Sequence, residues 1–215
     1  FEKDEAGNLG AGAALLEEIH EQQKAAGKAF KRIVLIGHST GAVYIGNLLE
    51  ASAKYLPAAS FDIVLLAPAI TYHKLAAAIA QHGNRIANLR RFAMQDGVEC
   101  ADQLVPHLYK RSLLYFVSGL VEFTHSPSPV RVPDMPLAGM QRFVNEPQFS
   151  QAPGAFPEIA AVEAFLKDKF ENGSVWSVTA GNVAAGLQSS STKHGDFDND
   201  ATTLASIVRI LSSGY

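Results

Sequence analysis

Short apolar runs alternate along the chain with longer stretches in which apolar residues recur every three or four positions. The runs at 32–36 and 61–69 are continuous and rich in β-branched residues, which is typical of strands covered on both faces of a sheet. Two further strands are predicted at 89–94 and 174–179. The longer stretches predict amphipathic helices. These helices are expected at 8–26, 41–56, 72–82, 111–123, 157–171 and near the C-terminus.

Two of the predicted helices have a defined apolar stripe that we expect to be buried. In the second helix the stripe consists of Tyr44, Leu48, Ala51 and Tyr55. In the last helix it consists of residues at positions i, i+3, i+4 and i+7, namely Leu204, Ile207, Val208 and Leu211. A stripe of this spacing is the mark of a helix that packs one face against a core.

The alternation of helices and strands predicts an α/β fold with a parallel sheet and helices on both faces. One segment, 107–171, interrupts the alternation, and it includes a stretch with four prolines at 125–139 that is not expected to form regular structure. We expect this segment to form a cap or lid where the strands end. The remaining residues, 1–106 and 172–215, would form the core.

The composition is that of a folded chain and restricts its partners. With 215 residues, of which 47% are hydrophobic, the chain can bury a full core. A net charge of −3 without basic clusters does not favour nucleic acid or an anionic membrane as a partner. Cys100 is the only cysteine, which excludes an intrachain disulfide and a CxxC zinc pair and favours a reducing compartment such as the cytoplasm. No apolar run reaches the roughly 18–20 residues of a membrane-spanning helix.

The strongest chemical signal is the sequence GHSTG, which follows the first predicted strand and precedes the second predicted helix. A sharp turn from strand to helix strains the backbone of the central residue, Ser39, and exposes its hydroxyl at the carboxyl end of the strand. Such a turn needs small neighbours, and Gly37 and Gly41 provide them. The N–H of Thr40, at the start of the helix, would point at a developing oxyanion.

This motif resembles the nucleophile elbow of the α/β-hydrolase superfamily, in particular its serine esterases and lipases. The resemblance covers nearly the whole chain in the order of elements, but only the later half of the family's fold. It implies that Ser39 is the nucleophile, that an acid follows the next-but-one strand and that a histidine follows the last strand. The resemblance implies no cofactor and no metal.

Among seven histidines, His194 is the candidate for the base that activates Ser39. It lies after the last predicted strand, in the loop before the C-terminal helix, and Gly195 follows it. His38, inside the elbow, is expected to point away from Ser39. The other histidines are assigned to helices, helix ends or the borders of the cap: His20, His73, His82, His107 and His125.

The base needs a carboxylate that fixes its tautomer. No Asp or Glu lies between Gly173 and His194, so the acid is expected after the strand at 89–94. Asp96 is the first candidate because it comes directly after that strand. Asp102 is the alternative, because its sequence DQLVP resembles the D-x-x-V-P found after the family's acid, and Glu99 is the third. Three later aspartates are expected to cap the last helix instead: Asp196, Asp198 and Asp200.

In the family, a second oxyanion donor comes from a loop upstream of the elbow. Only one helix and one strand precede Ser39, and the sequence opens without an initiator Met. A sheet of four strands would also leave an apolar edge uncovered. We therefore infer that residues 1–215 are the carboxyl part of a longer polypeptide or pair with a second chain, and that they need it for activity.

The function expected from these residues is hydrolysis of a small-molecule carboxylic ester through an acyl-enzyme. The same triad would serve an acyltransferase, a thioesterase or an amidase, because the substrate class depends on the cap. A non-catalytic binding protein of the same fold is the other alternative, although such a protein needs neither Ser39 nor His194.

Overall fold

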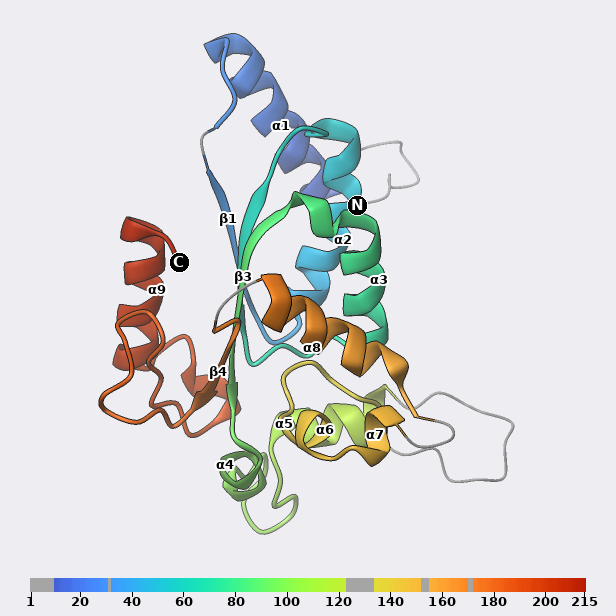
Figure 1. The fold of residues 1–215 in the computed structure, drawn as a ribbon, viewed down its shortest axis with the longest axis vertical. Coiled ribbons are helices and arrows are strands. Elements are labelled where there is room, and N and C mark those ends of the chain that lie inside the picture. The colour runs from blue at the N-terminus through green and yellow to red at the C-terminus, as the bar shows by residue number, and fades with distance from the viewer. Residues whose placement is uncertain (1–9, 31, 123–133, 152–154, 170–171) are drawn as a thin grey trace.

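The computed structural model describes residues 10–30, 32–122, 134–151, 155–169 and 172–215. They form an α/β fold around a parallel sheet with the strand order β1-β2-β3-β4 (Figure 1). The strands are β1 (Ile33–His38), β2 (Phe61–Leu66), β3 (Ile86–Met94) and β4 (Ser174–Ser177). The fold class and the four strands predicted from the apolar runs are confirmed.

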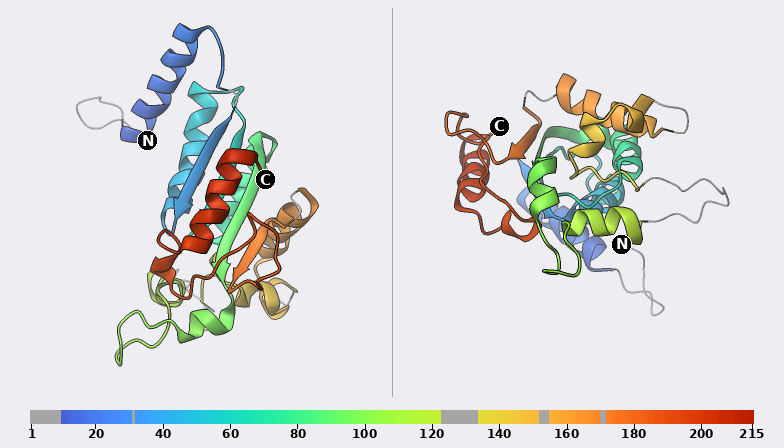
Figure 2. Two further views of the ribbon diagram at one scale, coloured as in Figure 1. Left: turned by 90° about the vertical axis from the view of Figure 1, so that its left-hand side faces the viewer. Right: turned by 90° about the horizontal axis from the view of Figure 1, so that it is seen from below.

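The helices cover both faces of the sheet, as the alternating order predicts (Figure 2). The helices α2 (Gly41–Tyr55), α3 (Tyr72–His82) and α8 (Pro157–Lys169) lie on one face, and α1 (Ala11–Ala26) packs against α2. The last helix, α9 (Ala201–Ser213), covers the opposite face. Each α/β crossover therefore runs from one strand over a sheet face to the next strand.

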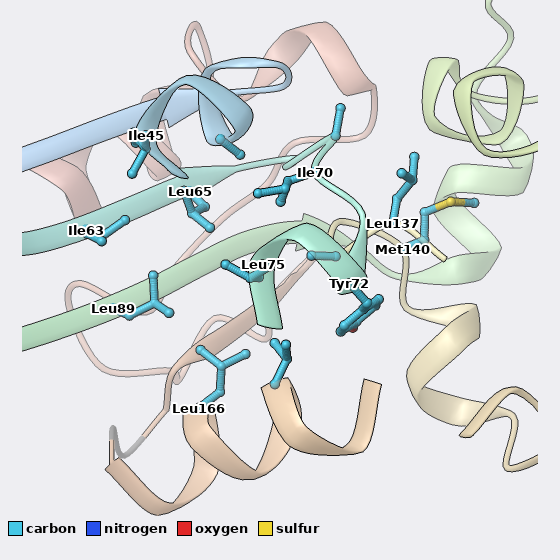
Figure 3. Close-up of a cluster of buried hydrophobic side chains, with 14 of the residues drawn as sticks. Ile45, Ile63, Leu65, Ile70, Tyr72, Leu75, Leu89, Leu137, Met140 and Leu166 are labelled. Carbon is cyan, nitrogen blue, oxygen red and sulfur yellow. The ribbon is translucent and has the colours of Figure 1, made fainter. Parts of the chain in front are cut away.

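The larger core cluster lies between the sheet and the helices α2, α3 and α8 (Figure 3). Ile63 and Leu65 of β2 point into it, as alternate residues of a strand must. Leu166 of α8 packs there too, so α8 belongs to the core cluster although it lies within the segment expected to be the cap. Leu137 and Met140, from the segment before α6, close the cluster beside Tyr72.

The second core cluster lies between the sheet and α9. Val64 and Phe92 come from the other face of β2 and β3, and Ile207 and Ile210 come from α9. At the start of β1 the guanidinium of Arg32 donates to the carbonyl oxygens of Ile210 and Leu211, which ties the end of α9 to the sheet.

The buried faces of α2 and α9 differ from those predicted. Helix α2 buries Ala42, Ile45, Leu48, Leu49 and Ser52, while Tyr44 is 47% exposed. The small residues let α2 approach the sheet closely, which a face with two tyrosines would not allow.

Helix α9 buries two hydroxyl residues in place of most of the predicted stripe. Thr203 bonds to Ser189, and Ser206 bonds to Gln188. Because these hydroxyls are satisfied, their burial costs little. Of the predicted stripe only Ile207 is buried, and Leu204, Val208 and Leu211 remain exposed.

Short helices of the segment expected to be a cap lie beyond the carboxyl ends of the strands (Figure 1). Its elements besides α8 are α5 (Leu113–Phe116), the π-helical turn η2 (Val117–Val121), α6 (Arg142–Asn145) and α7 (Gln148–Gln151). Residues 123–133, with His125 and most of the proline-rich stretch, lie outside the described part of the chain. The helix α4 (Asp96–Ala101), directly after β3, is not predicted by the apolar pattern.

The strand β1 has β2 as its neighbour on one side, and no other described strand pairs with it. Ile36 of β1 is in register with Val64 of β2, which faces α9, so the exposed Ile36 side chain lies on the α9 face of the sheet. In the described residues, none of the helices has the length and apolar character needed to cross a membrane.

Candidate active site

The turn from β1 into α2 holds Ser39 in a strained conformation. Its φ of 55° lies in the left-handed region, which is uncommon for a residue with a side chain. The conformation is fixed from both sides: the Ser39 N–H donates to Leu66 O at 2.9 Å, and Ser39 O accepts from the N–H of Ala69 at 3.0 Å. Leu66 is the last residue of β2 and Ala69 follows that strand, so the neighbouring strand positions the serine at the carboxyl end of the sheet.

The two glycines of the GHSTG motif have different roles. A Cβ on Gly37 would lie 2.7 Å from the carbonyl carbon of Gly41 and 2.7 Å from Cδ1 of Ile45, so only glycine fits there. A Cβ on Gly41 would meet no described atom within 4 Å. The prediction that both positions need a small residue is therefore wrong for Gly41, because the close approach involves its backbone and not its missing side chain.

The structure brings Ser39 and His194 together, although 154 residues lie between them in the sequence. Ser39 Oγ lies 2.9 Å from His194 Nε2. His194 begins a 3₁₀ turn, η3 (His194–Asp196), in the loop that leads from β4 to α9, and it is 6% exposed. Its other ring nitrogen, Nδ1, is buried and has no hydrogen-bond partner among the described residues.

The carboxylate next to His194 belongs to Asp102. Asp102 Oδ2 accepts from the main-chain N–H of His194 at 3.0 Å. Asp96, the first candidate from the sequence, instead accepts from the phenol of Tyr115 at 2.7 Å, and its own N–H donates to Gln141. The third candidate, Glu99, is fully buried and accepts from Ser112. Asp96 is the first residue of the six-residue helix α4, and Asp102 directly follows the last. The helix therefore leads the chain from the end of β3 to the position where Asp102 contacts His194.

His38, the residue before Ser39, contacts the main chain and the ring of His194. Its Nε2 lies 2.9 Å from the main-chain oxygen of His194, and the two ring centroids are 5.3 Å apart. Its Nδ1 lies 3.7 Å from Asp198 Oδ2. Of the three late aspartates, Asp200 is the N-cap of α9 and accepts from Thr203, whereas Asp198 faces His38. No feature of the sequence indicates the contacts of His38 and Asp198.

The first amide of the turn into α2 is available to an oxyanion. Among the described residues, none accepts a hydrogen bond from the Thr40 N–H. Thr40 is exposed and directly precedes α2, where unsatisfied amides and the helix dipole favour a negative charge. A second donor for an oxyanion is not identified in the described part of the chain.

The environment of His194 keeps its imidazole neutral. Burial and, to a smaller extent, the neighbouring His38 lower the pKa of His194 to about 4, although Asp198 acts in the opposite direction. Because a carbonyl oxygen only accepts, His38 Nε2 must carry the proton of its bond to His194. A neutral His194 can accept a proton from Ser39 through Nε2, with its own proton on Nδ1.

The remaining candidate histidines lie apart from this pair. His20 is in α1, and His73 in α3 pairs with Glu158. His82 ends α3, and His107 is in an exposed turn after Asp102.

The Sγ atom of Cys100 lies 3.4 Å from the phenol oxygen of Tyr115. In the described residues, no three metal-binding side chains gather closely enough to hold an ion.

Comparison of the chain with protein-family models, curated proteins and solved structures gives no match. The class that the fold and the site define is therefore an α/β protein with a four-stranded parallel sheet and a Ser–His pair at the carboxyl ends of its strands.

Proposed function

We propose that this protein is a serine hydrolase of the α/β-hydrolase type, and that it cleaves carboxylic esters through an acyl-enzyme. The observation that carries the proposal is the 2.9 Å contact between Oγ of the strained Ser39 and Nε2 of the buried His194. A serine hydroxyl is a poor nucleophile until a neighbouring base takes its proton, and a neutral imidazole in contact with it is that base.

In the first half of the reaction, Ser39 Oγ attacks the ester carbonyl carbon while its proton moves to His194 Nε2. The resulting oxyanion is stabilised by the Thr40 N–H. The tetrahedral intermediate collapses when His194 returns the proton to the departing alkoxide, which leaves as an alcohol. In the second half, His194 deprotonates a water that attacks the acyl-Ser39 ester, and the carboxylic acid and free Ser39 are released.

Asp102 is the acid that we assign to this mechanism. During both steps His194 becomes an imidazolium, and its Nδ1–H then needs a negatively charged partner. Nδ1 is buried without a described partner, and the Asp102 carboxylate is already bonded to the main chain of the same residue. The mechanism requires an Asp102 carboxylate oxygen to reach Nδ1 when the imidazolium forms.

The substrate is proposed to bind under the cap predicted at 107–171. The helices α5 and α6 lie beyond the carboxyl ends of the strands, where open α/β sheets bind ligands. A second chain is proposed to provide the second oxyanion donor. An acyl acceptor other than water would make the same site an acyltransferase, and thioesters or amides would use the same triad.

The test is covalent labelling of the full-length protein by a fluorophosphonate. We expect labelling of the unchanged protein and at least about a 100-fold lower rate in Ser39→Ala and in His194→Ala, because the label reports an activated serine. A Thr40→Ser variant, which keeps the amide, is the matched control and is expected to label normally. Absence of labelling in the folded full-length protein would favour the non-catalytic binding protein.

A further inference from the structure

We propose that His38 is a positioning residue that holds His194 in line with Ser39 by binding its main-chain carbonyl. The inference rests on the proposed function, and it adds a residue to the machinery of that site. It assigns a role to the second residue of the GHSTG motif, whose neighbour is the nucleophile.

The contacts of His194 show why its main chain matters. Side chains bind both polar atoms of its peptide unit: Asp102 accepts from the N–H at 3.0 Å, and His38 donates to the oxygen at 2.9 Å. The ring, in contrast, has a single hydrogen-bond partner among the described residues, Ser39, because Nδ1 has none. The direction of the imidazole is therefore set largely by how its backbone is held.

Two consecutive residues of the elbow, His38 and Ser39, each contact His194. Backbone strain at Ser39 turns its side chain to the ring of His194, while His38, the last residue of β1, reaches the carbonyl of the same histidine. The bond from His38 to the His194 carbonyl therefore holds the elbow next to the base even when the Ser39–His194 bond is broken. This matters during the reaction, because the proton transfer breaks and remakes that bond.

Asp198 supports the orientation of His38. Its carboxylate lies 3.7 Å from His38 Nδ1, on the side opposite to the bond with His194. A bond to Asp198 requires a proton on Nδ1 in addition to the one on Nε2, so Asp198 assists only the doubly protonated ring. The Asp198 side chain is more than half exposed, so this contribution is small.

Loss of the His38 bond should allow the loop around His194 to relax. A displacement of about 1 Å in a catalytic group costs on the order of 100-fold in rate. The loss should fall on the chemical step, because the His38 side chain bonds to the main chain of His194, whereas the reacting Ser39 Oγ is bonded to the ring of His194. It should therefore lower kcat and leave KM nearly unchanged.

The experiment compares His38→Gln with His38→Leu in the full-length protein. The glutamine amide can donate to the carbonyl of His194 and leucine cannot, while both have a size close to that of histidine. We measure the rate of fluorophosphonate labelling at Ser39, kcat and KM for a p-nitrophenyl ester, and the unfolding temperature. Ser190→Ala is the control, because Ser190 lies in the same loop and bonds to Asp200 without touching His194.

We expect labelling and kcat to fall at least about tenfold in His38→Leu, with KM changed less than about twofold. His38→Gln should recover most of the rate, and Ser190→Ala should label like the unchanged protein. Labelling of His38→Leu at the unchanged rate would overturn the proposal, as would a His38→Gln variant that is as slow as His38→Leu at the same unfolding temperature. Failure of the unchanged protein to label would instead overturn the proposed hydrolase function.

Discussion

Two aspartates near the end of β3 differ in what they contact, and this difference decides which one can assist His194. The Asp96 carboxylate accepts a hydrogen bond from Tyr115 of α5, one of the helices beyond the carboxyl ends of the strands. Asp102 is bonded to the main chain of His194 itself. The sequence could limit the acid to this region, since no carboxylate lies between Gly173 and His194. It could not choose between the two, because α4 changes the direction of the chain between them.

Substitution of the two aspartates should separate their roles. Asp102→Asn removes the charge that stabilises the His194 imidazolium, and we expect kcat to fall by about 100-fold or more. Asp96→Asn keeps a partner for Tyr115 and should change kcat by no more than a few-fold. Ester hydrolysis by the two variants, at matched unfolding temperatures, is the measurement. A larger loss in Asp96→Asn than in Asp102→Asn would contradict the assignment.

The two glycines of the elbow give a second contrast at this scale. In Gly37→Ala the new methyl group would overlap with the backbone of Gly41, and we expect a loss of about 1–3 kcal/mol in the free energy of unfolding. Gly41→Ala meets open space at the first position of α2 and should leave stability unchanged or raise it by up to about 1 kcal/mol. Urea unfolding of both variants tests this. Equal losses in the two variants would show that Gly41 is also sterically required.

Among the elements, the strands were the most predictable part of the fold and the short helices the least. The run at 61–69 is short, almost wholly apolar and ends at a proline, which favours a buried strand, and residues 61–66 form one. Helix α4 is a single turn and a half with a buried glutamate, so no apolar periodicity indicates it. The face of α9 was predicted wrongly for a related reason: the hydroxyls of Thr203 and Ser206 are buried because loop residues bind them, and such partners are not visible in a helical pattern.

The glutamate of α4 should make stability depend on pH. Burial, with a smaller effect of the charges of Asp96 and Asp102, raises the pKa of Glu99 from 4.5 to about 8, although the hydrogen bond from Ser112 opposes the change. Between these values the unfolded chain has released a proton that the folded chain retains. Raising the pH through this window therefore favours unfolding, and the protonated form is the stable one.

We expect Glu99→Gln, which mimics the protonated acid, to have nearly the stability of the unchanged protein at about pH 5. At about pH 9 it should be more stable than the unchanged protein by on the order of a few kcal/mol. The free energy of unfolding in urea at both pH values measures the difference, and Glu50→Gln, an exposed residue of α2, is the control. A pH dependence that is the same in Glu99→Gln and in the unchanged protein would contradict this account.

On the scale of the whole molecule, one side of the sheet leaves an apolar surface uncovered. It consists of Ile36 on β1 together with Leu204, Val208 and Leu211 on α9, of which Val208 is 61% exposed. The edge of β1 beside it has no partner strand among the described residues. An unpaired edge next to exposed apolar side chains is a surface at which proteins associate.

We expect residues 1–215 expressed alone to self-associate through this surface. The double substitution Val208→Glu and Leu211→Glu should shift the chain towards the monomer in sedimentation velocity, because charges on the surface oppose its burial. Leu108→Glu is the matched control, since Leu108 is 84% exposed in a turn beyond the strands. A chain that is already monomeric, or a control that dissociates it equally well, would contradict the role of this surface.

The central claim is that Ser39 becomes acylated during turnover, and trapping that intermediate tests it most directly. The full-length protein is mixed with a p-nitrophenyl ester, quenched in acid within milliseconds to seconds, digested, and analysed by mass spectrometry. We expect one acyl group per chain, on the peptide that contains Ser39, and none in Ser39→Ala. Ester hydrolysis that persists in Ser39→Ala, or an acyl group located on any other residue, would contradict the account.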